Sequence, residues 1–191
     1  MGNPRSHPNR GRTFEPTELA GALKELNQLK EKGVIEDYAI GGGYATIYHG
    51  IPYSTYDLDI FAIISGEDSL RILQPTYQYF RDKGYKIKGE HIYVGDMPFQ
   101  ILPNISPLSV NAVEEAHRVE LEGIPTKVIG VEHLIALSLV AFRWDDKSRI
   151  IKLLKRADRK SLNKILDRFG NEENQLHTRF QEVLAISQEV T

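Results

Sequence analysis

One stretch of the sequence, residues 38–64, constrains the fold of this chain more than any other. A short apolar run ends in three consecutive glycines, Gly41–Gly43, and thirteen residues then separate Gly43 from Asp57. That separation is long enough for one short helix and a return strand beside the first strand. The order of strand, glycine turn, helix and strand therefore brings the glycine turn next to the segment that carries Asp57.

Two aspartates belong to the return strand. Residues 56–64 are rich in β-branched and aromatic side chains, which is typical of a strand. Alternate residues of a strand point to the same face, so Asp57 and Asp59 are expected to project together, about 7 Å apart at the backbone. Two carboxylates this close repel each other unless a cation lies between them, and oxygen ligands favour Mg²⁺ or Mn²⁺. The alternative is an edge strand with an acidic, solvated face.

The glycine turn is a candidate anion site. Glycine allows a backbone to approach a bulky anion closely, and the first turn of a helix directs free N–H groups outward. Gly42, Gly43 and the helix start at Tyr44 are therefore candidates for contacts with phosphate. A plain strand-to-helix turn is the alternative for a glycine cluster taken alone. Beside a pair of metal-binding carboxylates, however, the turn is what metal-assisted phosphoryl transfer requires.

Three short motifs carry a resemblance to a known family: Gly42–Ala45, His49–Pro52 and Thr55–Asp59. In this order and spacing they resemble the signature of the DNA polymerase β-like nucleotidyltransferase superfamily, and most of all its small prokaryotic branch of abortive-infection type II toxins. The resemblance implies an α/β (α+β) fold, with a mixed β-sheet flanked by helices. It also implies transfer of an NMP from an NTP, with Mg²⁺ (or Mn²⁺) held by Asp57 and Asp59. The nucleotide-binding residues expected from these motifs are Gly42, Gly43, Tyr44 and Thr55.

The chain departs from this family at the third acidic position. Active relatives carry an acidic residue on a later strand, and the matching position in the strand expected at residues 97–102 is Gln100. An amide oxygen is a weak neutral ligand for Mg²⁺, and an amide cannot act as a general base. Gln100 is therefore expected to lie near the metal as an imperfect third ligand. Asp96, in the preceding turn, is an alternative only if that loop folds inward.

A second departure lies in residues 137–146. In the toxin-like branch the corresponding motif carries a lysine, an arginine and an Arg-Asp pair. Arg143 and Asp146 match it, whereas Ser138 stands where the lysine is expected. Arg143 is expected to bind the triphosphate as a bidentate donor, and Lys147 is a candidate replacement for the missing lysine. The alternative for Arg143 is an ordinary ion pair with Asp146 across one helical turn.

Composition limits the other functions of the chain. There is no cysteine, which excludes disulfides, a thiolate nucleophile and a cysteine-based zinc site. No apolar run approaches the roughly 20 residues of a membrane span, which predicts a cytoplasmic protein with no membrane partner. The net charge is −2, so the chain is not basic overall. Residues 147–160 nevertheless hold seven basic residues and one acid, a stretch that attracts RNA or an acidic partner protein, or else forms a solvated helix face.

The pattern of apolar residues predicts one main domain with a helical extension. Residues 1–14, rich in proline, glycine and arginine, are expected to be a disordered tail. Residues 15–130 form the expected nucleotidyltransferase-like core, and residues 131–191 form a C-terminal helical region packed on it. Core helices are expected at residues 16–32, 44–48, about sixteen residues that end at Gly84, and 107–116. Core strands are expected at residues 38–40, 56–64, 85–88, 91–94, 97–102, 118–121 and 126–129, the last two joined across residues 122–125. C-terminal helices are expected at residues 131–142, 145–155, 158–169 and 172–188.

Two functions of different classes follow from these observations. The first is a metal-dependent nucleotidyltransferase whose acceptor is a hydroxyl of an RNA, a protein or a small molecule. The second is a catalytically degenerate protein of the same fold that senses nucleotides or binds a partner protein, as half of a toxin–antitoxin-like pair. Gln100, Ser138 and Tyr53, the last at a place where relatives often have arginine, motivate the second hypothesis.

Overall fold

The computed structural model describes residues 15–64, 73–103, 106–171 and 175–189. The strands are β1 (Asp37–Ile40), β2 (Leu58–Ile63), β3 (Lys86–Lys88), β4 (His91–Val94), β5 (Met97–Pro103), β6 (His117–Leu121) and β7 (Ile124–Val128). The helices are α1 (Pro16–Glu31), α2 (Gly42–Tyr48), α3 (Gln74–Asp82), α4 (Pro107–Glu114), α5 (Val131–Ala141), α6 (Trp144–Leu153), α7 (Arg159–Phe169) and α8 (Leu176–Glu189). The tail predicted at residues 1–14 lies outside the described residues.

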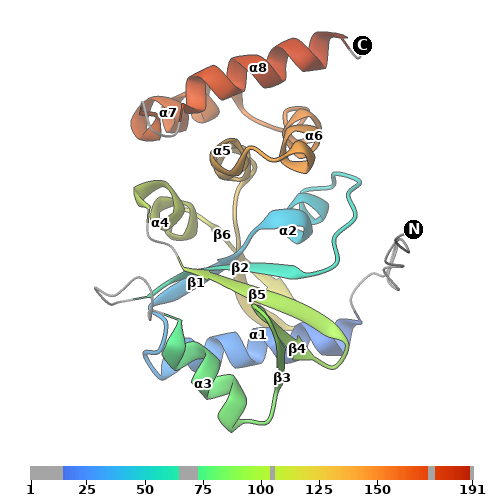
Figure 1. Ribbon diagram of the computed structural model, residues 1–191, viewed down its shortest axis with the longest axis vertical. Coiled ribbons are helices and arrows are strands. Elements are labelled where there is room, and N and C mark those ends of the chain that lie inside the picture. Colours follow the sequence, from blue (N-terminus) through green and yellow to red (C-terminus); the bar gives the residue numbers. More distant parts are fainter. Residues whose placement is uncertain (1–14, 65–72, 104–105, 172–174, 190–191) are drawn as a thin grey trace, which may run out of the picture.

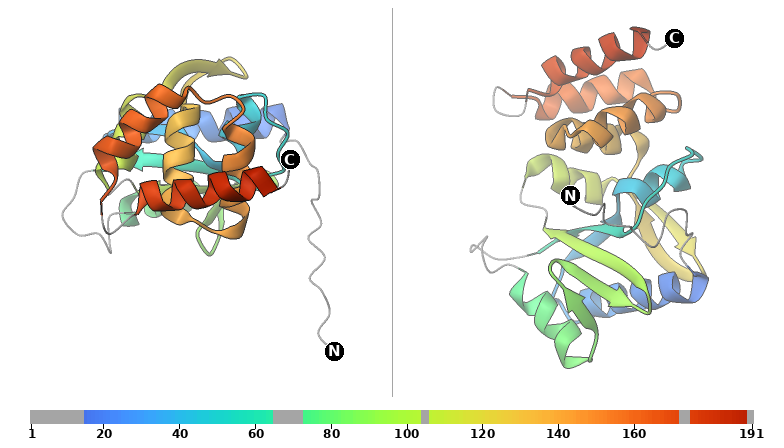
Figure 2. Two further views of the ribbon diagram at one scale, coloured as in Figure 1. Left: turned by 90° about the horizontal axis from the view of Figure 1, so that it is seen from above. Right: turned by 45° about the vertical axis from the view of Figure 1, so that its right-hand side comes forward.

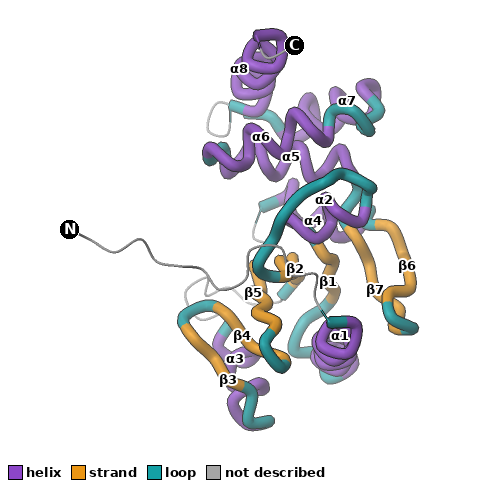
Figure 3. Tube along the Cα trace, turned by 90° about the vertical axis from the view of Figure 1, so that its right-hand side faces the viewer, coloured by secondary structure: helices purple, strands orange, loops and turns teal. Residues whose placement is uncertain are grey.

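A mixed sheet crosses the molecule, with helices on both of its faces (Figure 1). Helices α1 and α3 cover one face, and α2, α4 and the C-terminal helices lie on the other. The view along the edge of the sheet shows the same layers (Figure 3). The predicted architecture, a mixed β-sheet flanked by helices, is therefore confirmed.

The strand order of the sheet is β3-β4-β5-β2-β1-β7-β6. β1 and β2 are antiparallel neighbours, which confirms the return strand predicted from the spacing of the glycines and aspartates. β2 pairs in parallel with β5, and β1 pairs in parallel with β7. The register of β2 and β5 places Asp59 opposite Gln100. The topology of the sheet thus brings together residues that are far apart in the sequence.

The core lies between the sheet and the helices on each face. One face of α1 carries four leucines at helical spacing, and all of them are buried: Leu19, Leu23, Leu26 and Leu29. Full burial of one leucine side chain contributes roughly 1.5–3 kcal/mol. In β2 the residues Leu58, Ile60 and Ala62 are buried, whereas the alternate residues are half-buried. Because side chains alternate along a strand, Asp59 lies on the opposite face from Leu58 and Ile60.

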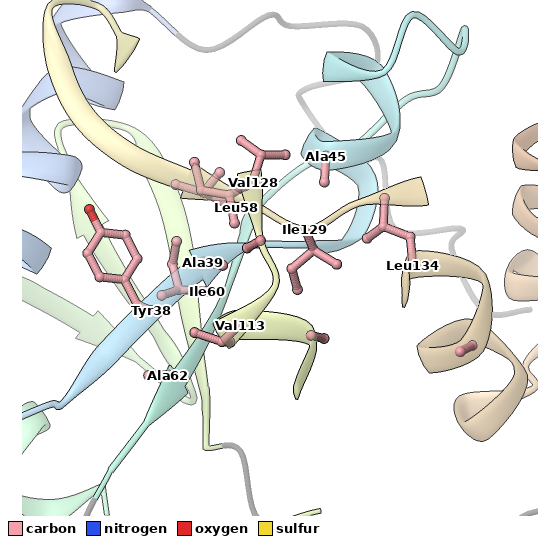
Figure 4. Packing of buried hydrophobic residues seen from close by; sticks show 14 of the residues in the cluster. Tyr38, Ala39, Ala45, Leu58, Ile60, Ala62, Val113, Val128, Ile129 and Leu134 are labelled. Carbon is pink, nitrogen blue, oxygen red and sulfur yellow. The ribbon is translucent and has the colours of Figure 1, made fainter. Parts of the chain in front are cut away.

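Helix α5 is the centre of the C-terminal helical region. It packs against α2 and α4 on its sheet side and against α6, α7 and α8 on its other sides. Figure 4 shows Leu134 of α5 near Ile129, which follows β7 directly. Helices α6 to α8 stack outward from α5, away from the sheet (Figure 2). Although α5 is strongly apolar, no helix in the described part of the chain is long and apolar enough to cross a membrane.

The helix predicted to end at Gly84 is shorter in the structure than predicted. In the structure α3 begins at Gln74, and Pro75 lies in its first turn. Proline is favoured at this position because its missing N–H would have no helical partner. The part of the prediction that precedes residue 73 falls outside the described residues. Gly84 follows the helix with a positive φ of 79°, so the predicted end is confirmed.

The turn between β6 and β7 is also shorter than predicted. Leu121 pairs with Ile124, so the turn contains only Glu122 and Gly123. Both turn residues have positive φ, 51° and 73° respectively, as expected for a two-residue hairpin turn. Pro125 belongs to β7, opposite Glu120. The sequence places this proline in the turn because proline often breaks strands, whereas here it occupies a strand position.

Candidate active site

Asp59 lies within β2, and Asp57 directly precedes that strand. The strand predicted at residues 56–64 is therefore shorter at both ends. The carbonyl oxygen of Asp59 accepts a hydrogen bond from the N–H of Gly41 at 2.9 Å, which ties the aspartates to the glycine turn. Burial, and next the negative charge of Asp57, raise the pKa of Asp59 to about 6. The two carboxylates thus repel each other, as expected from their spacing.

Gly42 is needed because the Asp59 carboxylate lies directly against it. Its φ is +55°, in the left-handed region that residues other than glycine rarely adopt. A Cβ atom at this position would lie 1.7 Å from Asp59 Oδ2, which is sterically impossible. The absent side chain therefore lets the start of α2 approach a carboxylate. The role of Gly42 in phosphate binding stays a prediction.

Gly43 and Thr55 shape the segment that leads to Asp57. A Cβ atom at Gly43 would lie 2.6 Å from the Cβ and Oγ1 of Thr55, so only glycine permits this contact. Thr55 Oγ1 donates to the carbonyl oxygen of Asp57 at 3.0 Å and lies 3.4 Å from its Oδ1. Tyr44 is half-buried, and burial and then the charge of Glu122 raise the pKa of its phenol. Thr55 thus positions Asp57, while Tyr44 lies within reach of the β6–β7 turn.

A row of polar side chains crosses three adjacent strands. Asp59 of β2 is opposite Gln100 of β5, and Gln100 is opposite His91 of β4. Residues that are directly opposite each other share a face of the sheet. His91 Nε2 lies 3.1 Å from Asp57 Oδ2, which closes the row. The structure therefore brings together Asp57, Asp59 and Gln100, and it adds His91, which the sequence analysis missed.

The sequence did contain a signal for His91. The two-residue turn at Gly95 and Asp96 pairs Val94 with Met97, and three further steps along each strand pair His91 with Gln100. The same turn excludes Asp96 as a replacement for Gln100. The N–H of Asp96 donates to Glu18 Oε1 of α1 at 2.7 Å, so this loop lies beside α1 and does not fold into the site.

A pocket of about 630 Å³ lies over this row, between the sheet and the helices α4, α5 and α6. Its floor includes Asp59 and Gln100, and its opposite wall includes Arg143 and Arg149. Arg149, then His91 when it is protonated, and then Arg143 act against the rise in the pKa of Asp59, because a positive charge nearby favours its ionised form. The volume is in the ordinary range for a small-molecule site. The pocket therefore presents the Asp59 carboxylate on one side and guanidinium groups on the other, and Asp57 is not among the described residues that line it.

In the pocket wall that contains Arg143 and Arg149, the side-chain partners differ from those predicted. The Oδ2 of Asp146 accepts the backbone N–H of Arg143 at 3.0 Å, and its Oδ1 binds the guanidinium of Arg149. The predicted alternative, an ion pair between the side chains of Arg143 and Asp146, is therefore wrong. Lys147 binds Glu182 of α8 at 2.5 Å and is not among the described residues that line the pocket. The role of Lys147 in nucleotide binding stays a prediction.

Glu90 is a pocket residue that the sequence analysis did not select. It lies in the turn between β3 and β4 and is exposed. Its carbonyl oxygen accepts a hydrogen bond from the hydroxyl of Tyr77 at 2.9 Å, which holds this turn against α3. Arg149 was missed as well, although its spacing of three residues from Asp146 is a recognisable helical ion-pair signal.

The donor set of the floor fits a divalent cation that has further ligands. Within the described ranges, no cluster of three or more His, Asp or Glu side chains is arranged to hold a metal ion. Asp57 and Asp59 offer carboxylate oxygens and Gln100 an amide oxygen beside them, a set that favours Mg²⁺ or Mn²⁺. Burial and the charge of Asp57 raise the pKa of Asp59, so a cation bound beside it would favour its ionised form. These residues suit a metal that completes its coordination with water or with oxygens of a bound ligand.

Comparison with known proteins identifies the fold. No protein-family model and no curated protein sequence matches the chain. The structure of ANT(2")-Ia with adenylyl-2"-tobramycin aligns with a TM-score of 0.52 and 15% identity, over 80% of this chain and 97% of that one. The solution structure of the same antibiotic-resistance factor aligns with a TM-score of 0.50 and 14% identity, over 92% and 97%. An antigenic nucleotidyltransferase-like protein from Paracoccidioides brasiliensis aligns with a TM-score of 0.50 and 18% identity, over 86% of this chain and 93% of that one.

At these identities the likeness establishes the fold alone. The chain has a nucleotidyltransferase-like fold, which confirms the architecture predicted from the motifs around Gly42 and Asp59. The narrower resemblance to abortive-infection type II toxins receives no support from these alignments and stays a prediction.

Proposed function

We propose that this protein is a metal-dependent nucleotidyltransferase, which moves an NMP from an NTP to an acceptor hydroxyl. The observation that carries the proposal is the pocket with Asp59 and Gln100 on one side and Arg143 and Arg149 on the other. An NTP needs both kinds of charge, because its phosphates bind cations and its accompanying metal ion binds carboxylates. The fold, which is that of nucleotidyltransferases, supports the same interpretation.

The proposed reaction is an in-line displacement at the α-phosphorus. The oxygen of the acceptor hydroxyl forms a bond to this phosphorus, and the bond to the oxygen that bridges the α- and β-phosphates breaks. Pyrophosphate leaves with the electron pair, and the hydroxyl proton passes to Glu90 or to solvent. Gln100 cannot take this proton, because an amide is not basic at neutral pH. Mg²⁺ or Mn²⁺, when held by Asp57 and Asp59, supplies Lewis-acid stabilisation of charge on the phosphate oxygens.

Other residues bind and orient the nucleotide in this proposal. Arg143, exposed at the pocket wall, donates to phosphate oxygens as a charge-assisted donor. Residues Gly42–Tyr44 form the first turn of α2, whose N–H groups favour an anion beside the metal-binding carboxylates. Thr55 acts through Asp57, because its hydroxyl donates to the carbonyl oxygen of that residue.

We propose a small molecule as the acceptor, in preference to an RNA or a protein. ANT(2")-Ia was solved with adenylyl-2"-tobramycin, so a small molecule that carries an adenylyl group fits a protein of this fold. The basic stretch at residues 147–160 is the feature that favours RNA. Two of its charges, however, are used within the protein, since Lys147 binds Glu182 and Arg149 binds Asp146.

Thermal unfolding with each of the four NTPs tests whether the pocket binds a nucleotide. We expect one NTP to raise the Tm of the wild type in the presence of Mg²⁺ and to leave Asp57→Asn unchanged, because that variant lacks a metal ligand. Ligand at about 100 times its Kd stabilises the folded state by about 2.7 kcal/mol, which is several degrees for a domain of this size. Asp82→Asn, on the exposed side of α3, is the matched control and should respond like the wild type. The absence of a shift with every NTP would contradict nucleotide binding.

A catalytically degenerate nucleotide sensor or partner-binding protein is the second candidate. The observation that favours it is the neutral amide of Gln100 opposite Asp59. Incubation with an NTP labelled at its α-phosphate, with panels of small-molecule and RNA acceptors, separates the two candidates, because only an enzyme transfers the label. The same transfer assay on Gln100→Asp, which restores an acidic residue at this position, gives a second comparison. A large gain of transfer in this variant indicates decay of an enzyme, whereas a loss indicates that the glutamine is functional.

A further inference from the structure

The guanidinium of Arg149 is held in the pocket wall by two buried side chains. The Arg149 side chain is only 16% exposed, and Ser138 and Asp146 are both buried. Nε and Nη2 lie 3.3 and 3.1 Å from Ser138 Oγ, and Nη2 also donates to Asp146 Oδ1. The ring of Tyr53 lies on a further side, with its centroid 5.8 Å from the guanidinium carbon. Arg149 thus joins α5, α6 and the loop before β2 at one point.

Ser138 leaves the room that this arginine occupies. Its hydroxyl donates to the carbonyl oxygen of Leu134 at 2.7 Å, so its lone pairs are available to Arg149. A lysine at position 138 would instead place a second cation against the guanidinium. The small serine on α5 and the arginine on α6 are therefore complementary, and the positive charge at this point comes from α6.

Arg149 also faces the carboxylate floor. Arg149 and Asp59 line the same pocket, and the charge of Arg149 acts on Asp59 more strongly than that of His91 or Arg143. Lys147, the neighbouring cation, is directed to Glu182 of α8 instead. Arg149 therefore combines three properties of a phosphate ligand: a positive charge, partial enclosure, and a position opposite the metal-binding carboxylates.

We propose that Arg149 binds the terminal phosphates of the nucleotide and that Ser138 and Asp146 hold it in position for this contact. The inference rests on the proposed function, because it assigns one ligand group within the same pocket. Ser138 and Asp146 bind Nε and Nη2, and the Tyr53 hydroxyl is a further hydrogen-bond partner of the Arg149 side chain, so the remaining guanidinium N–H donor is assigned to a phosphate oxygen. Arg149 thereby takes the role that the sequence analysis assigned to Lys147.

Calorimetric titration with inorganic tripolyphosphate and MgCl₂ tests this assignment without knowledge of the base or the acceptor. Arg149→Gln/Asp146→Asn removes the ion pair of the pocket wall and leaves no buried charge unpaired. Lys147→Gln/Glu182→Gln removes the neighbouring ion pair between α6 and α8 and is the matched comparison. Circular dichroism shows whether each variant is folded at the temperature of the titration.

We expect the Kd for tripolyphosphate to rise roughly ten- to hundred-fold in Arg149→Gln/Asp146→Asn, the loss expected for hydrogen bonds to a charged group. We expect less than about a threefold change in Lys147→Gln/Glu182→Gln. If both paired variants bind like the wild type, Arg149 only neutralises Asp146 and the proposal is wrong. If the Kd for tripolyphosphate rises only in Lys147→Gln/Glu182→Gln, the proposal is also wrong. A wild type that binds neither tripolyphosphate nor any NTP is a different result, because it overturns the proposed function itself.

Single substitutions cover the case in which the paired variant does not fold. Arg149→Lys keeps a positive charge beside Asp146 but lacks the planar fork, so we expect roughly five- to tenfold weaker binding with little change in Tm. Arg149→Ser is expected to lose more affinity, and the addition of Ser138→Lys, which returns a cation to α5, is expected to restore most of it. Wild-type affinity in a folded Arg149→Ser variant would overturn the proposal.

Discussion

The charge of Asp59 is expected to destabilise the folded protein at neutral pH, so Asp59→Asn should be more stable than the wild type. Burial and the nearby charge of Asp57 raise the pKa of Asp59, and the charges of Arg149, His91 and Arg143 offset this only in part. Asparagine has the same shape but carries no charge that must be desolvated. The prediction applies to protein without divalent metal, because a bound cation would stabilise the ionised carboxylate.

The size of the effect follows from the pKa of Asp59, which rises from 3.8 to about 6 on folding. The unfolded chain releases this proton at a lower pH than the folded protein does, so stability falls as the pH rises between these two values. At pH 8 the full effect is about 3 kcal/mol, because one pKa unit corresponds to about 1.4 kcal/mol. At pH 4.5 about 1 kcal/mol of the effect is present. Both are upper values, since the side chain is partly exposed and solvent screens its charge.

Urea denaturation of wild type and variant at pH 8 and pH 4.5, without divalent metal, measures this difference. We expect Asp59→Asn to be about 1–3 kcal/mol more stable than the wild type at pH 8 and less than about 1 kcal/mol more stable at pH 4.5. Asp82→Asn, exposed on α3, should differ from the wild type by less than about 0.5 kcal/mol at both pH values. Equal stability of Asp59→Asn and wild type at pH 8, or a gain of the same size at both pH values, would refute the reasoning.

Two further predictions concern the fold, and urea denaturation measures both. Gly42→Ala should lose more than about 2 kcal/mol, because its Cβ overlaps Asp59 in addition to the strain of a positive φ. Gly123→Ala, with positive φ and open space around it, should lose only about 1–2 kcal/mol, and equal losses would contradict the importance of the Asp59 contact. Leu23→Ala should lower the free energy of unfolding by about 2–5 kcal/mol, because Leu23 is fully buried. The control Lys24→Ala, at an exposed position of the same helix, should leave the free energy of unfolding almost unchanged. A loss below about 1 kcal/mol for Leu23→Ala would contradict the packing of α1.

Local patterns were sufficient to predict one part of the pocket floor. The alternation in β2 and the spacing from Gly43 to Asp57 describe neighbours within one or two elements. The place of Gln100 beside the aspartates was instead implied by the family resemblance, and the register of Asp59 and Gln100 agrees with it. His91 could also have been found, because a two-residue turn fixes the register of its hairpin. Such features depend on the period of a strand and the length of a turn, which the sequence displays directly.

The helical wall could not be predicted in the same way. Arg143, Lys147 and Arg149 are close in sequence and carry the same charge, so their spacing alone does not say which of them faces the pocket. In the structure these residues have different partners that are distant in the sequence, since Lys147 forms an ion pair with Glu182 of α8 and Arg149 donates a hydrogen bond to Ser138 of α5. These contacts depend on how α5, α6 and α8 pack, which no short pattern specifies.

The floor and the wall of the pocket come from separate stretches of the gene product. Asp59 and Gln100 of the floor precede residue 101, whereas Arg143 and Arg149 of the wall follow residue 142. Mutations in α5 to α8 can therefore change what the pocket accepts while the carboxylates remain as they are. The helical part of the chain, its last sixty or so residues, can change in this way without any change in the floor. Chains that share the glycine and aspartate motifs are then expected to share the floor of the pocket more often than its wall.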